Sequence, residues 1–142
     1  MPTHVLVVDD EEFMRSLLVS GLNRAGFLVT TANDAAEALS LLIDGVAAPA
    51  PVDLLLTDFN MPRLTGLDLV DALRRAGVEL PCFLMSGDMN EALAAEALSR
   101  GCVGFMGKPF GLPVLVGHIH QALEISAAGQ KQASRALEAQ DY

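Results

Sequence analysis

The chain has few basic residues: 9 Lys and Arg stand against 18 Asp and Glu, which gives a formal charge of −9 and a pI near 4.5. Arg74 and Arg75 form the one adjacent basic pair. A surface this acidic repels the phosphate backbone of nucleic acids, and no basic cluster offsets the repulsion locally. We therefore expect no direct contact with DNA or RNA.

Long apolar runs are also missing. No stretch approaches the roughly 18 residues that a transmembrane helix needs, and the amino end lacks the basic flank and the apolar length of a signal peptide. We expect no membrane insertion. The two cysteines, Cys82 and Cys102, both lie in apolar segments, which favours buried free thiols over a disulfide. These features predict a cytoplasmic protein.

Short apolar runs, in contrast, recur along the chain, and 51% of the 142 residues are hydrophobic, which is ample for one domain with its own core. Five runs stand out, at 5–8, 27–31, 53–57, 82–86 and 102–106. Four of them are nearly continuous rather than alternating, which is typical of parallel strands covered on both faces.

Segments with helical periodicity separate these runs. One ends at Gly26, a second begins at Asp34 and continues to about residue 43, and others cover about 66–76, 90–100 and 112–123. Five strand–helix units predict an α/β fold: a flavodoxin-like, doubly wound, five-stranded parallel sheet of order 2-1-3-4-5 with five helices, in a three-layer sandwich. We expect a domain over residues 1–125 and a tail over 126–142 that either extends the last helix or is mobile.

Polar residues follow the predicted strands where each one ends. They are Asp9 and Asp10 after the first, Asp58 and Asn60 after the third, Ser86 and Asp88 after the fourth, and Lys108 after the fifth. Each has a structural explanation when taken singly, as a helix N-terminal charge or a turn residue. Taken together, they would lie at one edge of the predicted sheet, where open α/β sheets bind their ligands.

Three carboxylates close together repel one another, and either a proton or a cation must relieve that repulsion. Ligands that are all oxygen favour Mg²⁺, or Mn²⁺, as the cation bound by Asp9, Asp10 and Asp58. Lys108 on the opposite side would complete a clamp for a small anion such as a phosphoryl group, and Ser86 would offer it a hydroxyl.

These residues give the chain a strong resemblance, over about residues 3–125, to the receiver domain of two-component response regulators. Four segments carry it: Val-Leu-Val-Val-Asp9-Asp10-Glu, Asp58-Phe-Asn60-Met-Pro with Gly66, Leu-Met-Ser86-Gly, and Gly-Phe105-Met-Gly-Lys108-Pro109-Phe. The resemblance implies a single-domain phospho-accepting switch rather than an enzyme. Its phosphoryl donor would be a sensor histidine kinase or a histidine phosphotransfer protein.

The resemblance also implies residue roles. Asp58 would accept the phosphoryl group, Asp10, Asp58 and the Asn60 carbonyl would bind Mg²⁺ directly, Asp9 would act largely through water, and Lys108 would pair with the phosphoryl group. Ser86 and Phe105 would switch conformation together, and the Lys108–Pro109 peptide would be cis. A plain strand-core position is a compatible interpretation of Phe105. Asn60 and Asp88 would set the lifetime of the phosphorylated state.

Several functions stay open at this point. Phosphorylation would alter binding to an unidentified downstream protein through the fourth helix, fifth strand and fifth helix, or would drive homodimerisation. Alternatively, the chain is a receiver module of a hybrid kinase or relay in which phosphotransfer itself is the output. A dehalogenase-like phosphatase would need a second Asp at position 60, where Asn stands. A flavodoxin-like FMN carrier would need a phosphate loop where this chain has four acids.

Overall fold

Five parallel strands form the centre of the molecule. The computed structural model describes residues 2–44 and 51–124. Its strands are β1 (His4–Val8), β2 (Leu28–Ala32), β3 (Leu54–Asp58), β4 (Cys82–Ser86) and β5 (Gly104–Gly107). They lie in the order β2-β1-β3-β4-β5, and every neighbouring pair is parallel. The predicted sheet order is therefore confirmed.

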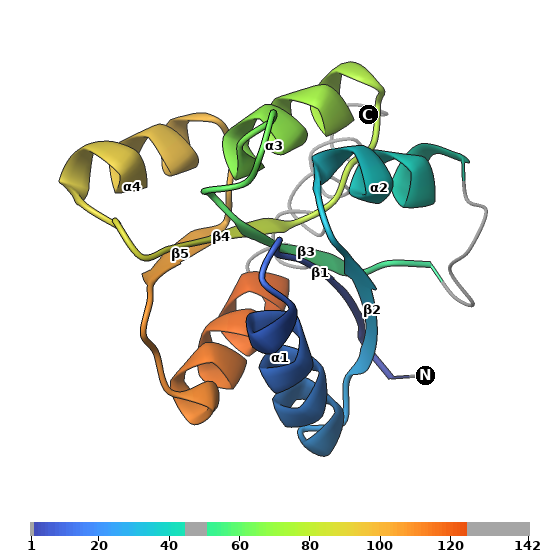
Figure 1. Ribbon diagram of the computed structural model, residues 1–142, viewed down its shortest axis with the longest axis vertical. Coiled ribbons are helices and arrows are strands. Elements are labelled where there is room, and N and C mark those ends of the chain that lie inside the picture. The colour runs from blue at the N-terminus through green and yellow to red at the C-terminus, as the bar shows by residue number, and fades with distance from the viewer. Residues whose placement is uncertain (1, 45–50, 125–142) are drawn as a thin grey trace, which may run out of the picture.

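Helices cover both faces of this sheet (Figure 1). α1 (Glu12–Arg24) and the last helix, residues 112–124, lie on one face. α2 (Ala35–Leu39), α3 (Gly66–Arg75) and α4 (Glu91–Ser99) lie on the other, and α2 continues into a π-helical turn over Ser40–Asp44. The predicted three-layer sandwich is thus confirmed.

The core is split by the sheet into two apolar layers. Alternate strand residues face each layer: Leu6 and Leu55 pack toward α2, α3 and α4, whereas Val7 and Leu56 pack toward α1 and the last helix. Burial on both faces explains why β1, β3 and β4 are apolar along almost their whole length.

Local signals define where the helices begin and end. α1 ends where Gly26 takes a φ of +96°, a conformation that glycine adopts without steric cost. At the start of α2, Asp34 accepts a hydrogen bond from the Glu37 amide at 2.8 Å, and the Glu37 carboxylate accepts one from the amide of Asn33. A reciprocal capping box joins Thr65 to Asp68 at the start of α3.

Some predicted boundaries are wrong by a few residues. The predicted fifth strand begins at residue 102, but β5 begins at Gly104, because the buried Cys102 lies in the connection between α4 and β5. Both cysteines are free and buried, as predicted, and burial raises the pKa of Cys82 to about 12 and of Cys102 to about 11. The predicted tail, 126–142, lies outside the described residues.

No helix within residues 2–44 and 51–124 combines the length and the apolar character that crossing a bilayer requires.

Candidate functional site

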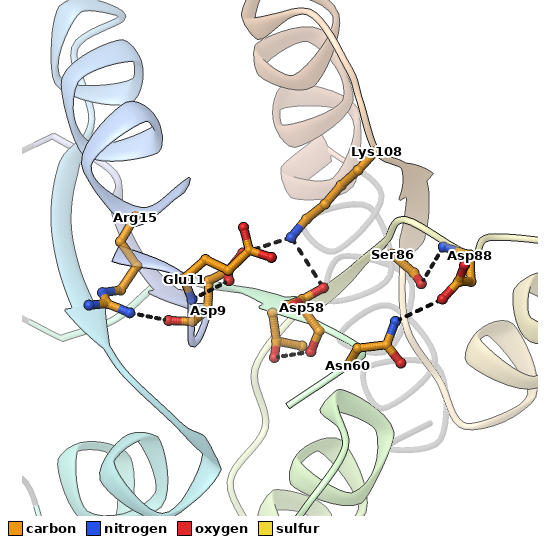
Figure 2. A network of polar contacts seen from close by, with 9 residues as sticks. Asp9, Glu11, Arg15, Asp58, Asn60, Ser86, Asp88 and Lys108 are labelled. Atoms are coloured by element: carbon orange, nitrogen blue, oxygen red, sulfur yellow. Dashed lines mark hydrogen bonds and ion pairs between the residues drawn. The ribbon is translucent and has the colours of Figure 1, made fainter. Parts of the chain in front are cut away.

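The carboxyl ends of four strands bring the candidate residues together. Asp9 follows β1, Asp58 is the last residue of β3, Ser86 is the last residue of β4, and Lys108 follows β5. β1 and β3 are neighbours, and the helices that follow them, α1 and α3, lie on opposite faces of the sheet (Figure 1). Figure 2 shows the four side chains at this edge, with Lys108 directed at Asp9 and Asp58.

Three carboxylates form the acidic part of the site. Asp9, Asp10 and Asp58 each offer one oxygen, and these oxygens lie within 4.8 Å of one another. Asp9 and Asp58 are buried and Asp10 is exposed. Buried like charges this close need a cation, and a set of carboxylate oxygens with one side open to water is the donor set that Mg²⁺ binds. The residues present therefore fit the predicted metal.

Lys108 supplies the positive charge within the protein itself. Its Nζ lies 2.8 Å from Oδ2 of Asp9 and 3.3 Å from Oδ1 of Asp58. Burial alone would lower the pKa of this ammonium, but the hydrogen bond and charge of Asp9 together with the charge of Asp58 outweigh burial and raise it. Lys108 thus remains charged, and the Lys108–Pro109 peptide is cis, as the resemblance implies.

In the metal-free protein the pKa of the Asp58 carboxyl is raised. Burial raises its pKa from 3.8 to about 6, the nearby Lys108 ammonium opposes that shift, and the charges of Asp9 and Asp10 add to it. A carboxylate that is costly to ionise gains from a bound cation, because the cation stabilises its charged form.

Asp9 is held by contacts on both carboxylate oxygens. Its Oδ1 accepts a hydrogen bond from the Glu11 amide at 2.9 Å, and its Oδ2 accepts one from Nζ of Lys108. Its main-chain carbonyl accepts from Nη1 of Arg15 at 2.7 Å (Figure 2). The sequence interpretation missed Arg15. The available signal was a basic residue one turn into a helix that begins with acids, in a chain with few bases.

The loops after β3 and β4 meet beside Asp58. Nδ2 of Asn60 donates to Oδ2 of Asp88 at 3.3 Å, and the Asp88 amide donates to Oγ of the buried Ser86 at 3.0 Å (Figure 2). The structure therefore joins the two residues predicted to set the phosphoryl lifetime. Gly66 lies against the same strand end, and a Cβ at that position would overlap the main-chain carbonyl of Asp58.

The environment of Phe105 differs from the predicted strand core. Its side chain is 36% exposed, so the interpretation as a plain strand-core residue is wrong. The reason is topological: β5 is an edge strand of the sheet and only four residues long.

Comparisons with known proteins agree with this geometry. The family model for the response regulator receiver domain matches residues 5–120. Response regulator MprA of Mycobacterium sp. (strain KMS) is 32% identical over 137 residues, which cover 96% of this chain and 57% of that protein. The chain spans about a quarter to just over half of the length of the curated relatives it matches first.

Solved structures show the same fold. The crystal structure of FixJ-N has a TM-score of 0.77 and 31% identity, covering 87% of this chain and 95% of that one. Chemotaxis protein CheY4 of Vibrio cholerae has a TM-score of 0.77 and 28% identity, covering 86% and 99%. The flavodoxin-like architecture predicted from the sequence is shared with these proteins.

Proposed function

Because the chain belongs to the response regulator receiver domain family, we propose that it is a switch in which Asp58 accepts a phosphoryl group from a phosphohistidine. One observation carries the proposal. The buried Asp58 carboxylate lies between two further carboxylates, with oxygens within 4.8 Å, and the Lys108 ammonium at 3.3 Å. A nucleophile, a cation site and a fixed positive charge are the parts that phosphoryl transfer needs.

The chemistry is an in-line displacement at phosphorus. One carboxylate oxygen of Asp58 attacks, an O–P bond forms, and the P–N bond to the donor imidazole breaks with its electron pair going to nitrogen. Lys108 binds a phosphoryl oxygen and offsets its charge. No proton has to leave Asp58 above its pKa of about 6, so positioning and charge neutralisation dominate over acid–base catalysis.

Asp10, Asp58 and the main-chain carbonyl of Asn60 would hold Mg²⁺ or Mn²⁺ directly, and Asp9 would act largely through water. The bound ion would neutralise charge on the carboxylates and on the phosphoryl oxygens. Asp9 suits an indirect role, since both of its carboxylate oxygens already accept hydrogen bonds from Glu11 and Lys108.

Switching would begin at Ser86. Its hydroxyl oxygen accepts a hydrogen bond from the Asp88 amide in this structure, and in the phosphorylated state it turns to a phosphoryl oxygen. The exposed Phe105 then moves into the space that opens.

The output surface lies on α4, β5 and the last helix. Each of these elements exposes a large apolar side chain: Leu98 on α4, Phe105 on β5 and Val114 on the last helix. A receiver domain interacts with a histidine kinase or phosphotransfer protein, and this surface would bind the downstream protein or a second activated copy. A cytoplasmic location is part of the proposal, because the two buried cysteines are free.

The test is phosphorylation by a small donor. We expect acetyl phosphate with Mg²⁺ to add one phosphoryl group to the parent, detected by intact mass, and to add none to Asp58→Asn or in the presence of EDTA. Beryllofluoride with Mg²⁺ should shift the NMR signals of Ser86 and Phe105 in the parent alone. Phosphorylation that survives Asp58→Asn would refute the assignment. Transfer back from Asp58 to an isolated phosphotransfer histidine would instead favour a relay.

A further inference from the structure

The main-chain carbonyl of Asp9 has an unusual partner. β1 ends at Val8, which pairs with Ala32 of β2 and Thr57 of β3, and the Asp9 amide still donates to the Ala32 carbonyl at 3.2 Å. The Asp9 carbonyl, in contrast, accepts its hydrogen bond from a side chain, the Arg15 guanidinium, at 2.7 Å (Figure 2). Hydrogen bonds from a charged donor are roughly twice as strong as neutral ones.

This contact closes the turn between β1 and α1. Arg15 lies in the first full turn of α1, where its own amide donates to the Glu11 carbonyl. Its side chain therefore reaches back from the helix to the peptide group that joins Asp9 to Asp10. The Asp9 side chain is fixed by Glu11 and Lys108, but among the described contacts Arg15 alone holds the carbonyl of that peptide.

The orientation of this peptide matters for Asp10. Asp10 is the exposed member of the three carboxylates, and no hydrogen bond to its side chain is found among the described residues. Its position thus depends on the backbone that carries it. Turning the Asp9–Asp10 peptide would swing the Asp10 carboxylate away from Asp58.

We propose that Arg15 is a positioning residue that holds the Asp9–Asp10 peptide so that the Asp10 carboxylate faces Asp58 in a geometry ready for a divalent cation. The inference rests on the proposed function of this site. Among the described contacts, the Arg15 guanidinium is hydrogen-bonded to the Asp9 main chain and to none of the three carboxylates, so it acts on the site through the backbone.

Positioning and charge predict effects of opposite sign. If Arg15 acted only as a nearby positive charge, its removal would tighten binding of a cation to the acidic cluster. If Arg15 orients the ligands, its removal weakens binding, and loss of such outer partners typically costs 10–100-fold in metal affinity. We expect a loss on the order of tenfold.

The experiment measures Mg²⁺ and Mn²⁺ affinity by calorimetry on the full chain, without a phosphoryl donor. Arg15→Met keeps the apolar stem of the side chain and removes both the charge and the donors, whereas Arg15→Lys keeps the charge and an ammonium donor group. We expect Arg15→Met to weaken binding and Arg15→Lys to recover most of the loss. Arg24→Met, at the far end of α1, is the matched control and should bind like the parent.

The outcomes separate this inference from the proposed function. Equal or tighter binding by Arg15→Met would overturn the positioning role while leaving the phosphoryl switch intact. A parent chain that neither binds Mg²⁺ nor accepts a phosphoryl group would overturn the proposed function itself. If Arg15→Met does not fold, Arg15→Gln, whose shorter side chain carries no charge, takes its place. Weaker binding by Arg15→Gln supports the positioning role, because loss of the charge alone would tighten binding, and equal or tighter binding overturns it.

A second readout is structural. Amide NMR signals of Asp10 and Glu11 in the metal-free chain report the orientation of this turn. We expect them to shift in Arg15→Met and to stay near their parent positions in Arg24→Met. Unshifted signals in Arg15→Met would contradict the inference.

Discussion

The side-chain amide of Asn60 donates a hydrogen bond to the carboxylate of Asp88 at 3.3 Å and so joins the loop after β3 to the loop after β4. The two residues are 28 positions apart in sequence and both are exposed. Their contact lies beside Asp58 (Figure 2). The lifetime of a phosphoryl group on Asp58 should depend on it.

Asp88→Ala removes this bridge, and we expect the phosphorylated protein to lose its phosphoryl group several-fold faster. Decay is followed by intact mass after removal of acetyl phosphate. Asp88→Asn is the matched control, because it keeps an acceptor for Asn60 but no charge. A half-life near the parent value in Asp88→Asn assigns the effect to the bridge, and a short one assigns it to the charge. Equal half-lives in all three proteins would contradict the prediction.

Asp58 should destabilise the metal-free fold at neutral pH. Its pKa is about 6 in the folded protein against an ordinary value of 3.8, so folding favours the protonated form. The protonated Asp58 carboxyl makes its full contribution to the unfolding free energy below pH 3.8, and this contribution is lost as the pH rises through about 6. At pH 7 the ionised group therefore costs about 2 to 3 kcal/mol of unfolding free energy.

We expect Asp58→Asn to exceed the parent in unfolding free energy by that amount at pH 7 in EDTA, and to lose the advantage between pH 6 and 4. Urea unfolding at several pH values measures the difference. Saturating Mg²⁺ should stabilise the parent and reverse much of the gap. A difference that does not change with pH would show that ionisation of Asp58 is not its cause.

Much of the site follows from the sequence because it lies at strand ends. Continuous apolar runs reveal buried parallel strands, and in a parallel sheet the residues after each run meet at one edge. That reasoning alone places Asp9, Asp58, Ser86 and Lys108 together, and the structure agrees. The contact between Asn60 and Asp88 also follows from two neighbouring strand ends, although no pattern specifies the hydrogen bond itself.

Other features depend on tertiary geometry that carries no periodic signal. The link from Arg15 to the Asp9 carbonyl joins a side chain to a main-chain atom, so no pairing of residue types reveals it. The exposure of Phe105 follows from the edge position of β5, which an apolar run does not report. The predicted start of β5 is wrong for a related reason: Cys102 is apolar and buried without belonging to the strand.

The turn that follows the acceptor contains a strained residue. Arg63 has a φ of +72°, which an L-residue with a Cβ adopts at a cost, and the Leu64 amide donates to the Pro62 carbonyl at 2.9 Å across it. Arg63→Gly should raise the unfolding free energy by about 1 kcal/mol, measured by urea unfolding. Arg63→Ala, which keeps the Cβ and removes the charge, should leave it near the parent value. Equal gains in both variants would assign the effect to charge instead of strain.

Position 66 requires glycine because the backbone there lies close to the main chain of Asp58 at the end of β3. Its amide donates to the Phe59 carbonyl at 3.0 Å, and an added Cβ would overlap the Asp58 carbonyl and lie 2.9 Å from Cδ1 of Leu84. Gly66→Ala must therefore displace the backbone of Asp58. We expect a loss of about 1 to 3 kcal/mol in unfolding free energy, and slower phosphorylation by acetyl phosphate.

Gly117 in the last helix provides the matched control, since a Cβ there meets no atom within 4 Å. Gly117→Ala should raise the unfolding free energy by up to about 1 kcal/mol, because alanine is the better helix former, and should leave the phosphorylation rate unchanged. Rates are compared by intact mass at saturating Mg²⁺, so that a change in metal affinity does not mask the result. If Gly66→Ala has the stability of the parent and is phosphorylated as fast, the prediction is wrong, and the close approach of residue 66 to Asp58 affects neither folding nor phosphorylation.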